Sequence, residues 1–146
     1  MVQTAAKPTL NFTIRPASLA DLNFITDTWM RSFRRSITMR DMNSQEYFVR
    51  QRPVMESLLA RSTVFVGEEP RSGELVSYIV FERKQSGCVV HWLYTKLVFR
   101  NLGIGASMLE AAAKGDSPIY YTHKPTAIYG VKLAKKYSAQ YNPKFL

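Results

Sequence analysis

The sequence contains very little of the chemistry that builds disulfides, metal sites or membrane spans. Its 146 residues include one cysteine, Cys88, and two histidines, His91 and His123. A single cysteine forms no intramolecular disulfide, and no Cys/His set has zinc-ligand spacing. No apolar run approaches the roughly 20 residues that cross a bilayer, and the N-terminus lacks the apolar segment of a secretory signal. We therefore expect a reduced protein of the cytoplasm, with no metal and no membrane partner.

Negative charge is scarce as well. The chain has 11 acidic and 20 basic side chains, a formal net charge of +9, which favours anionic partners such as phosphates, nucleic acid or an acidic protein face. Hydrophobic residues make up 46% and charged residues 21%, a composition that excludes intrinsic disorder. This length suits one compact domain, so we expect a single domain over residues 1–146 with a loose leader at residues 1–11.

Two kinds of periodicity alternate along the chain. Runs rich in β-branched and aromatic residues predict strands at residues 12–15, 63–67, 74–83, 88–95 and 118–123. Apolar spacings of three and four predict helices at residues 19–35, 44–60, 106–114 and 126–136, the second divided or kinked at Pro53. The tail after residue 137 supplies one short edge strand. Short turns make the three middle strands antiparallel neighbours, so we expect an α+β fold with a mixed, mostly antiparallel central sheet flanked by helices.

The most informative segment is residues 88–109, CVVHWLYTKLVFRNLGIGASML. A strand runs into a glycine-containing loop, and a helix begins at once. Glycine lets the backbone approach a ligand closely, and a helix N-terminus presents unpaired N–H groups, so this loop suits a pyrophosphate. A Rossmann fingerprint would need glycine where Met108 stands, and a Walker loop would need Gly-Lys-Ser/Thr, which is absent. The remaining match is R/Q-x-x-G-x-G/A.

With this motif and element order, the chain from Phe12 to about Tyr137 resembles the GNAT superfamily of acetyl-CoA-dependent acyltransferases. The resemblance implies a GNAT-like acyl-CoA acyltransferase fold, shortened at its C-terminus and similar to short phage-encoded members. It also implies acetyl-CoA as acyl donor, loop amides on the pyrophosphate and a strand amide near Leu93 on the thioester carbonyl. The cofactor-binding residues it implies are Leu93, Tyr94, Thr95, Arg100, Asn101, Leu102, Gly103, Ile104, Gly105 and Ala106.

The resemblance also suggests a general base. Period-two alternation predicts that Val89, His91, Leu93 and Thr95 share one face of their strand. In the serotonin N-acetyltransferase branch, a histidine at the position of His91 serves as base, and the other histidine of that pair is Val89 here. An imidazole of ordinary pKa can take a proton from an amine directly or through water. Glu82 is the second candidate base, and a buried histidine bonded to a backbone carbonyl is the structural alternative for His91.

The family commonly places a tyrosine on the last helix to protonate the leaving thiolate. The aligned position is Val131, with Tyr129 and Tyr137 nearby. We choose Tyr129 as the catalytic tyrosine; direct departure of the thiolate is the alternative.

The expected function is therefore transfer of an acetyl group from acetyl-CoA to a primary amine, either a protein lysine or N-terminus, or a small amine. A tRNA-directed acetyltransferase is one alternative, which the net charge would suit. The other is a catalytically silent module that binds acyl-CoA or nucleic acid. Basic segments at residues 28–52 and 115–146 flank the expected cleft and could recruit an acidic protein or RNA. The sequence names no acceptor and leaves a homodimer open.

Overall fold

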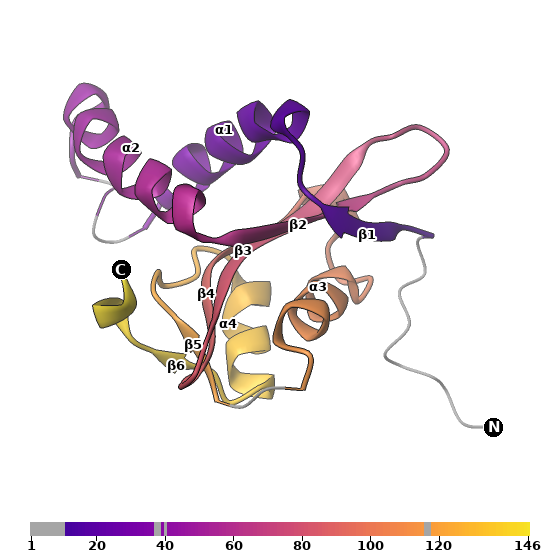
Figure 1. The fold of residues 1–146 in the computed structure, drawn as a ribbon. Helices are drawn as coiled ribbons and strands as arrows, with labels where there is room; N and C mark the ends of the chain where they lie inside the picture. Colours follow the sequence, from indigo (N-terminus) through magenta and orange to yellow (C-terminus); the bar gives the residue numbers. More distant parts are fainter. Residues whose placement is uncertain (1–10, 37–38, 40, 116–117) are drawn as a thin grey trace.

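The computed structural model describes residues 11–36, 39, 41–115 and 118–146, so most of the predicted leader and Arg40 lie outside the described residues. Its centre is a six-stranded sheet in the order β1-β2-β3-β4-β5-β6 (Figure 1). The strands are β1 (Thr13–Pro16), β2 (Thr63–Glu68), β3 (Leu75–Lys84), β4 (Gly87–Thr95), β5 (Ile119–Tyr121) and β6 (Gln140–Tyr141). β1 to β4 pair antiparallel, whereas β5 is parallel to β4 and β6 is parallel to β5. The predicted mixed, mostly antiparallel sheet with a short edge strand is confirmed.

Helices cover both faces of the sheet. α1 (Leu22–Phe33) and α2 (Ser44–Arg61) lie over one face, and α3 (Ile104–Ala113) and α4 (Ile128–Lys136) lie over the other (Figure 1). Short 3-10 turns precede α1 (Leu19–Asp21), follow β4 (Leu97–Phe99) and close the chain (Pro143–Phe145). The predicted α+β class and element order are confirmed. α2 runs through Pro53 as one helix, so division into two pieces is wrong.

Each face of the sheet has its own hydrophobic core. The core under α1 and α2 contains Trp29, Tyr47 and Trp92. The core under α3 contains Phe81 and Met108. The two cores bury the apolar side chains of β3 and β4 on both faces, which holds the strands that carry the candidate site rigidly in place.

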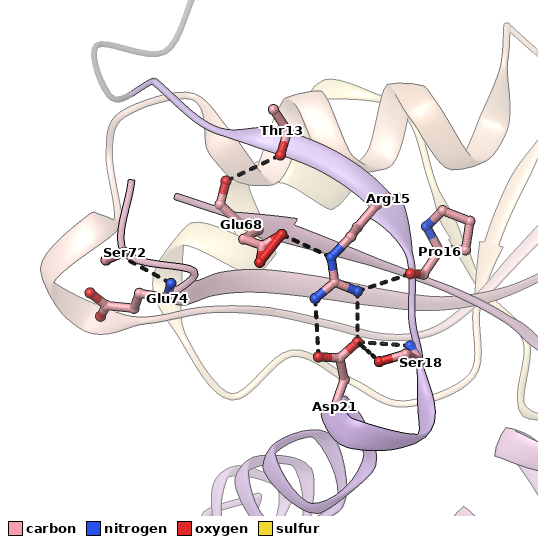
Figure 2. Close-up of polar contacts among 8 residues, drawn as sticks. All are labelled: Thr13, Arg15, Pro16, Ser18, Asp21, Glu68, Ser72 and Glu74. Carbon is pink, nitrogen blue, oxygen red and sulfur yellow. Dashed lines mark hydrogen bonds and ion pairs between the residues drawn. The ribbon is translucent and has the colours of Figure 1, made fainter. Parts of the chain in front are cut away.

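Arg15 fixes the start of α1 to the edge of the sheet (Figure 2). Its Nη1 lies 2.8 Å from Oδ2 of Asp21, and its Nε lies 2.9 Å from Oε2 of Glu68 on β2. The same Asp21 carboxylate accepts the N–H of Ser18 at 2.8 Å, as in a capping box. The hydrogen bonds from Arg15 lower the pKa of Asp21 although burial acts in the opposite direction.

β4 contains one residue more than β3 opposite it. Val80 pairs with Trp92, but the next residue, Phe81, pairs with Val90, so His91 is left as a β-bulge. A bulge reverses the alternation of side chains along the strand. The bulge therefore decides which face His91 and its neighbours occupy.

Candidate active site

The candidate site is an opening between two parallel strands. β5 pairs with β4 only from Cys88–Ile119 to Val90–Tyr121, whereas β4 continues to Thr95. A cavity lies beyond the last pair, and its walls come from β4, the end of β5 and α4; they include His91, Leu93, Tyr121, His123 and Tyr129. Ligands of open sheets bind at the carboxyl ends of parallel strands, and this cavity has that position.

The edge of β4 presents main-chain groups to this cavity. The hydroxyl of Tyr129 accepts the N–H of Thr95 at 3.1 Å and donates to the carbonyl of Leu93 at 3.4 Å. The N–H and C=O of one strand residue point toward the same edge. The Leu93 N–H therefore also faces the open edge, at the position expected for a group that holds the thioester carbonyl.

The loop at residues 100–106 joins β4 to α3 and has the backbone of an anion cradle. Asn101 and Gly103 have positive φ angles of 67° and 82°. The N–H of Ser107 bonds to the carbonyl of Gly103 at 3.1 Å, the first main-chain bond of the helix. The N–H groups of residues 104–106 belong to the first turn, which lies before this bond, so they have no carbonyl partner within the helix. They lie at the positive end of the helix dipole. α3 begins at Ile104, two residues before the predicted start at residue 106.

The two glycines of the loop are needed for different reasons. Gly103 has the left-handed conformation that favours glycine. Gly105 packs closely against α4, and a side chain there would be crowded, because a Cβ would lie 3.0 Å from Cδ1 of Leu133. Ile104 is buried in the core and Leu102 packs against it. These loop residues can therefore meet a ligand chiefly through the main chain.

Arg100 joins the strand, the loop and α4. Its Nε donates to the Thr95 carbonyl at 2.8 Å, and its guanidinium lies 4.7 Å from the centre of the Tyr129 ring. Tyr94 instead stacks on Tyr78 beneath α1, with ring centres 5.4 Å apart. Of the predicted cofactor residues, the structure brings Leu93, Thr95 and Arg100 together at Tyr129, whereas the Tyr94 ring lies on the α1 side of the sheet.

His91 and Glu82 are in direct contact. Nε2 of His91 lies 2.7 Å from Oε2 of Glu82, and Nδ1 of His91 lies 2.9 Å from Oγ1 of Thr122. The His91 side chain is 0% exposed, and both ring nitrogens contact side chains. Burial lowers the pKa of His91 although the bond to Glu82 acts in the opposite direction. Burial would raise the pKa of Glu82, but His91, Arg61 and Lys84 lower it below its ordinary value.

The predicted sharing of one face by Val89, His91, Leu93 and Thr95 is wrong. Cys88, Val90 and Leu93 all pack toward the α3 core, an arrangement that strict alternation forbids and the bulge at His91 produces. Val89 and His91 therefore point toward the α1 and α2 side, where His91 meets Glu82. Leu93 points to the opposite side.

Of the tyrosines considered for the acid, Tyr129 is the one that reaches β4. Tyr137 donates to Oε1 of Glu110 at 2.6 Å, on the outer side of α3. Val131, the aligned position, is 56% exposed. Burial raises the pKa of Tyr129, although Arg100 acts in the opposite direction, so the phenol is protonated near neutral pH. The geometry therefore favours Tyr129 over Tyr137.

Two polar residues of the cavity region were missed by the sequence reasoning, which considered His123 only as a zinc ligand. Thr122 and His123 follow β5 directly and are both buried. No local signal marked them, because the predicted strand at residues 118–123 contains both, whereas β5 ends at Tyr121 and its parallel pairing with β4 is a long-range contact.

The described residues contain neither a metal site nor a membrane span. No cluster of three or more His, Cys, Asp or Glu side chains in this part of the chain is placed to hold a metal ion. None of the helices described combines the length and apolarity needed to span a membrane.

Comparisons with known proteins agree with the fold. No protein-family model and no curated protein matches the chain. Among solved structures, a GCN5-related N-acetyltransferase from Ralstonia eutropha JMP134 is similar, with 19% identity, a TM-score of 0.63, and 86% of this chain and 90% of that chain covered. A ribosomal-protein-alanine N-acetyltransferase from Brucella melitensis biovar Abortus 2308 is 16% identical, with a TM-score of 0.59 and coverages of 86% and 90%.

A third similar structure contains a ligand. The PaiA N-acetyltransferase from Thermoplasma acidophilum, solved in complex with coenzyme A, is 20% identical, with a TM-score of 0.53, and 72% of this chain and 71% of that chain are covered. The protein therefore has the fold of the GNAT N-acetyltransferases. The predicted fold is confirmed, and the resemblance to phage-encoded members stays a prediction.

Proposed function

We propose that this protein is an N-acyltransferase that moves an acetyl group from acetyl-CoA to a primary amine. The observation that carries the proposal is the juxtaposition of an open β4 edge at Leu93 with the start of α3, joined through Arg100 and Tyr129. An acyl-CoA thioester needs a donor for its carbonyl and a cradle for its diphosphate, and these two features would supply them. The similar structures have the same fold, and one of them binds coenzyme A.

The fit to acetyl-CoA can be stated residue by residue. The Leu93 N–H would hold the thioester carbonyl, and the N–H groups of residues 103–106 would hold the pyrophosphate. The substrate supplies an activated acetyl group. Tyr129 is the acid in this proposal: as the amine forms a C–N bond and the C–S bond breaks, the departing thiolate takes the phenolic proton, and the acylated nitrogen returns a proton to Tyr129. His91 and Glu82 would receive the proton that the acceptor amine loses before it attacks.

A base is needed because the acceptor is cationic in solution. A lysine-like amine has a pKa near 10.4, so presenting it neutral at pH 7 costs about 4.6 kcal/mol. The acceptor class, whether protein, small amine or charged tRNA, stays open within this proposal. The cytoplasmic location and the homodimer also stay predictions.

Binding and transfer can be tested separately. Titration calorimetry with acetyl-CoA should give saturable heat, whereas acetyl-pantetheine, which lacks the diphosphate, should bind much more weakly. Mass spectrometry of a cell lysate treated with the protein and isotope-labelled acetyl-CoA should then show labelled amines. No heat with acetyl-CoA, or a crystal soak that places it away from residues 100–106, would contradict the proposal. Binding without transfer to protein, polyamine or charged-tRNA panels would support the catalytically silent alternative.

A further inference from the structure

A chain of buried hydrogen bonds runs through the sheet from β3 to α2. It connects Glu82 to His91 at 2.7 Å, His91 to Thr122 at 2.9 Å, Thr122 to His123 at 3.0 Å, and His123 to Gln51 at 3.5 Å. These side chains come from β3, β4, the segment after β5, and α2. The bulge at His91 turns its ring toward Glu82 and Thr122 and so makes the chain continuous.

The chemistry of the groups gives this chain one direction. A carboxylate only accepts, so His91 donates from Nε2 to Glu82 and, as a neutral ring, accepts at Nδ1. The hydroxyl of Thr122 therefore donates to His91 and accepts from Nδ1 of His123. Nε2 of His123 is then an acceptor, and it faces the amide nitrogen of Gln51. Each of the four contacts then joins one donor to one acceptor while both imidazoles are neutral.

The two ends of the chain differ in their surroundings. Glu82 is 12% exposed and contacts Arg61 from α2 at 3.1 Å and Lys84 from β3 at 3.6 Å. His123 lines the cavity between β4 and β5 and is 8% exposed. The bond from Gln51 to His123 is the longest of the four, which makes it the one an entering donor most readily replaces.

The imidazole of His123 is held firmly where it meets the cavity. The rings of Trp29, Phe33 and Trp92 pack edge-on around it, with centres 4.7 to 6.1 Å from its own. Trp92 lines the cavity together with His123, whereas Trp29 and Phe33 lie behind them in the core. A donor that enters the cavity therefore meets His123 in a fixed orientation, at the cavity end of the hydrogen-bond chain.

We infer that His123 accepts the proton of the acceptor ammonium, and that Thr122, His91 and Glu82 carry a proton from it to the protein surface. The inference rests on the proposed acyltransfer and adds the residue that takes the proton of the acceptor and the path by which that proton leaves. The ammonium gives one proton to Nε2 of His123. His123 passes its Nδ1 proton to Thr122, Thr122 passes its own to Nδ1 of His91, and His91 passes its Nε2 proton to Glu82. Glu82 then loses one proton to water, which leaves a neutral amine and balances the step.

In this arrangement His91 does not touch the acceptor; it is a relay and positioning residue behind His123. The sharpest test is at Thr122, because Thr122→Val removes the hydroxyl at nearly constant shape and leaves both imidazoles in place. Thr122→Ser restores the hydroxyl and is the matched rescue. Both are compared with the unaltered protein, using the amine acceptor identified with labelled acetyl-CoA.

At pH 7 we expect Thr122→Val to lower kcat at least tenfold with little change in KM for acetyl-CoA, and Thr122→Ser to recover most of the lost rate. The defect should shrink as pH approaches 10, because solution then supplies the neutral amine that the relay otherwise produces. A purely structural role would leave the defect independent of pH. His123→Gln, which cannot carry a proton through the ring, should show the same dependence on pH.

The outcomes separate this inference from the proposed function. If the unaltered protein transfers acetyl groups and Thr122→Val matches it at pH 7, or its defect persists unchanged to pH 10, the relay is wrong and the acyltransferase stands. If the unaltered protein binds no acetyl-CoA and transfers nothing, the proposed function fails and the relay fails with it.

Discussion

The hydroxyl of Tyr129 accepts a hydrogen bond from the main-chain N–H of Thr95 at 3.1 Å. This contact brings a phenol from α4 to the edge of β4 that faces the cavity, within 3.4 Å of the Leu93 carbonyl. The phenol keeps its proton near neutral pH because burial raises its pKa. A proton donor thus lies at the strand edge where the thioester is proposed to bind.

Tyr129→Phe should therefore lower kcat by about 100-fold, as loss of a general acid does, while acetyl-CoA affinity changes little. Tyr137→Phe is the matched control, because that hydroxyl bonds Glu110 away from the strand edge. Steady-state rates with the identified acceptor, together with calorimetry for acetyl-CoA, distinguish the two effects. Equal rates for both variants would remove Tyr129 from the mechanism.

The left-handed backbone at Gly103 should matter for ligand binding as well as for stability. Gly103→Ala forces an L residue to a φ of 82° and should cost about 1 to 2 kcal/mol of unfolding free energy. Gly115→Ala is a close control, since Gly115 has a φ of 78° and open space at its Cβ. Urea unfolding should show similar losses for both variants. Calorimetry should show weaker acetyl-CoA binding for Gly103→Ala alone, and equal affinities would contradict the proposed anion cradle.

Much of the fold was predictable because hydrophobic periodicity is a local signal. The order of strands and helices, the antiparallel meander and the short edge strand all follow from it. Whether Pro53 divides the helix did not follow from it, because α2 continues through the proline while Tyr47 and Leu58, on either side of it, pack into one core. Burial along both halves of the helix outweighs the local cost of the proline, and that burial depends on tertiary structure.

The sequence predicted where the main-chain part of the candidate site lies, but not how the side chains around it are oriented. The glycine pattern indicated the loop at residues 100–106, since glycine spacing and a following helix are visible in one segment. The orientation of His91 depends on a bulge, and the bulge depends on how Val80 and Phe81 pair across strands. Thr122 and His123 reach the site through the parallel pairing of β5 with β4, a long-range contact that no local pattern contains.

The ion pair between Arg15 and Asp21 should contribute to the pH dependence of the free energy of unfolding in acid. Because Arg15 lowers the pKa of Asp21, the ionised carboxylate stabilises the fold above its unfolded pKa of about 3.9, and this stabilisation is lost as pH falls through the lower folded value. Asp21→Asn should cost about 1 to 3 kcal/mol at pH 7 and flatten the pH dependence below 4. Asp27→Asn is the control, because the Asp27–Arg31 pair is 65% exposed on both sides and should change stability by under about 0.5 kcal/mol. Urea unfolding between pH 2.5 and 7 provides the measurement, and equal losses for the two variants would show that the contact drawn in Figure 2 does not anchor α1.

The neutral state of His123 should make the protein less stable in mild acid. Burial lowers the pKa of His123 to about 4, whereas the unfolded value is about 6.5. Between these values the unfolded chain binds a proton that the folded protein does not, so stability falls as pH decreases from about 6.5 to 4, by about 3 kcal/mol from this residue. The lowered pKa of His91 acts in the same direction, so His123→Asn should remove part of the slope and leave the remainder. Denaturant unfolding at intervals from pH 4 to 7.5 checks this, in a window above the one in which Asp21 titrates. An unchanged slope in His123→Asn would mean that burial does not lower the pKa of His123 in the folded protein.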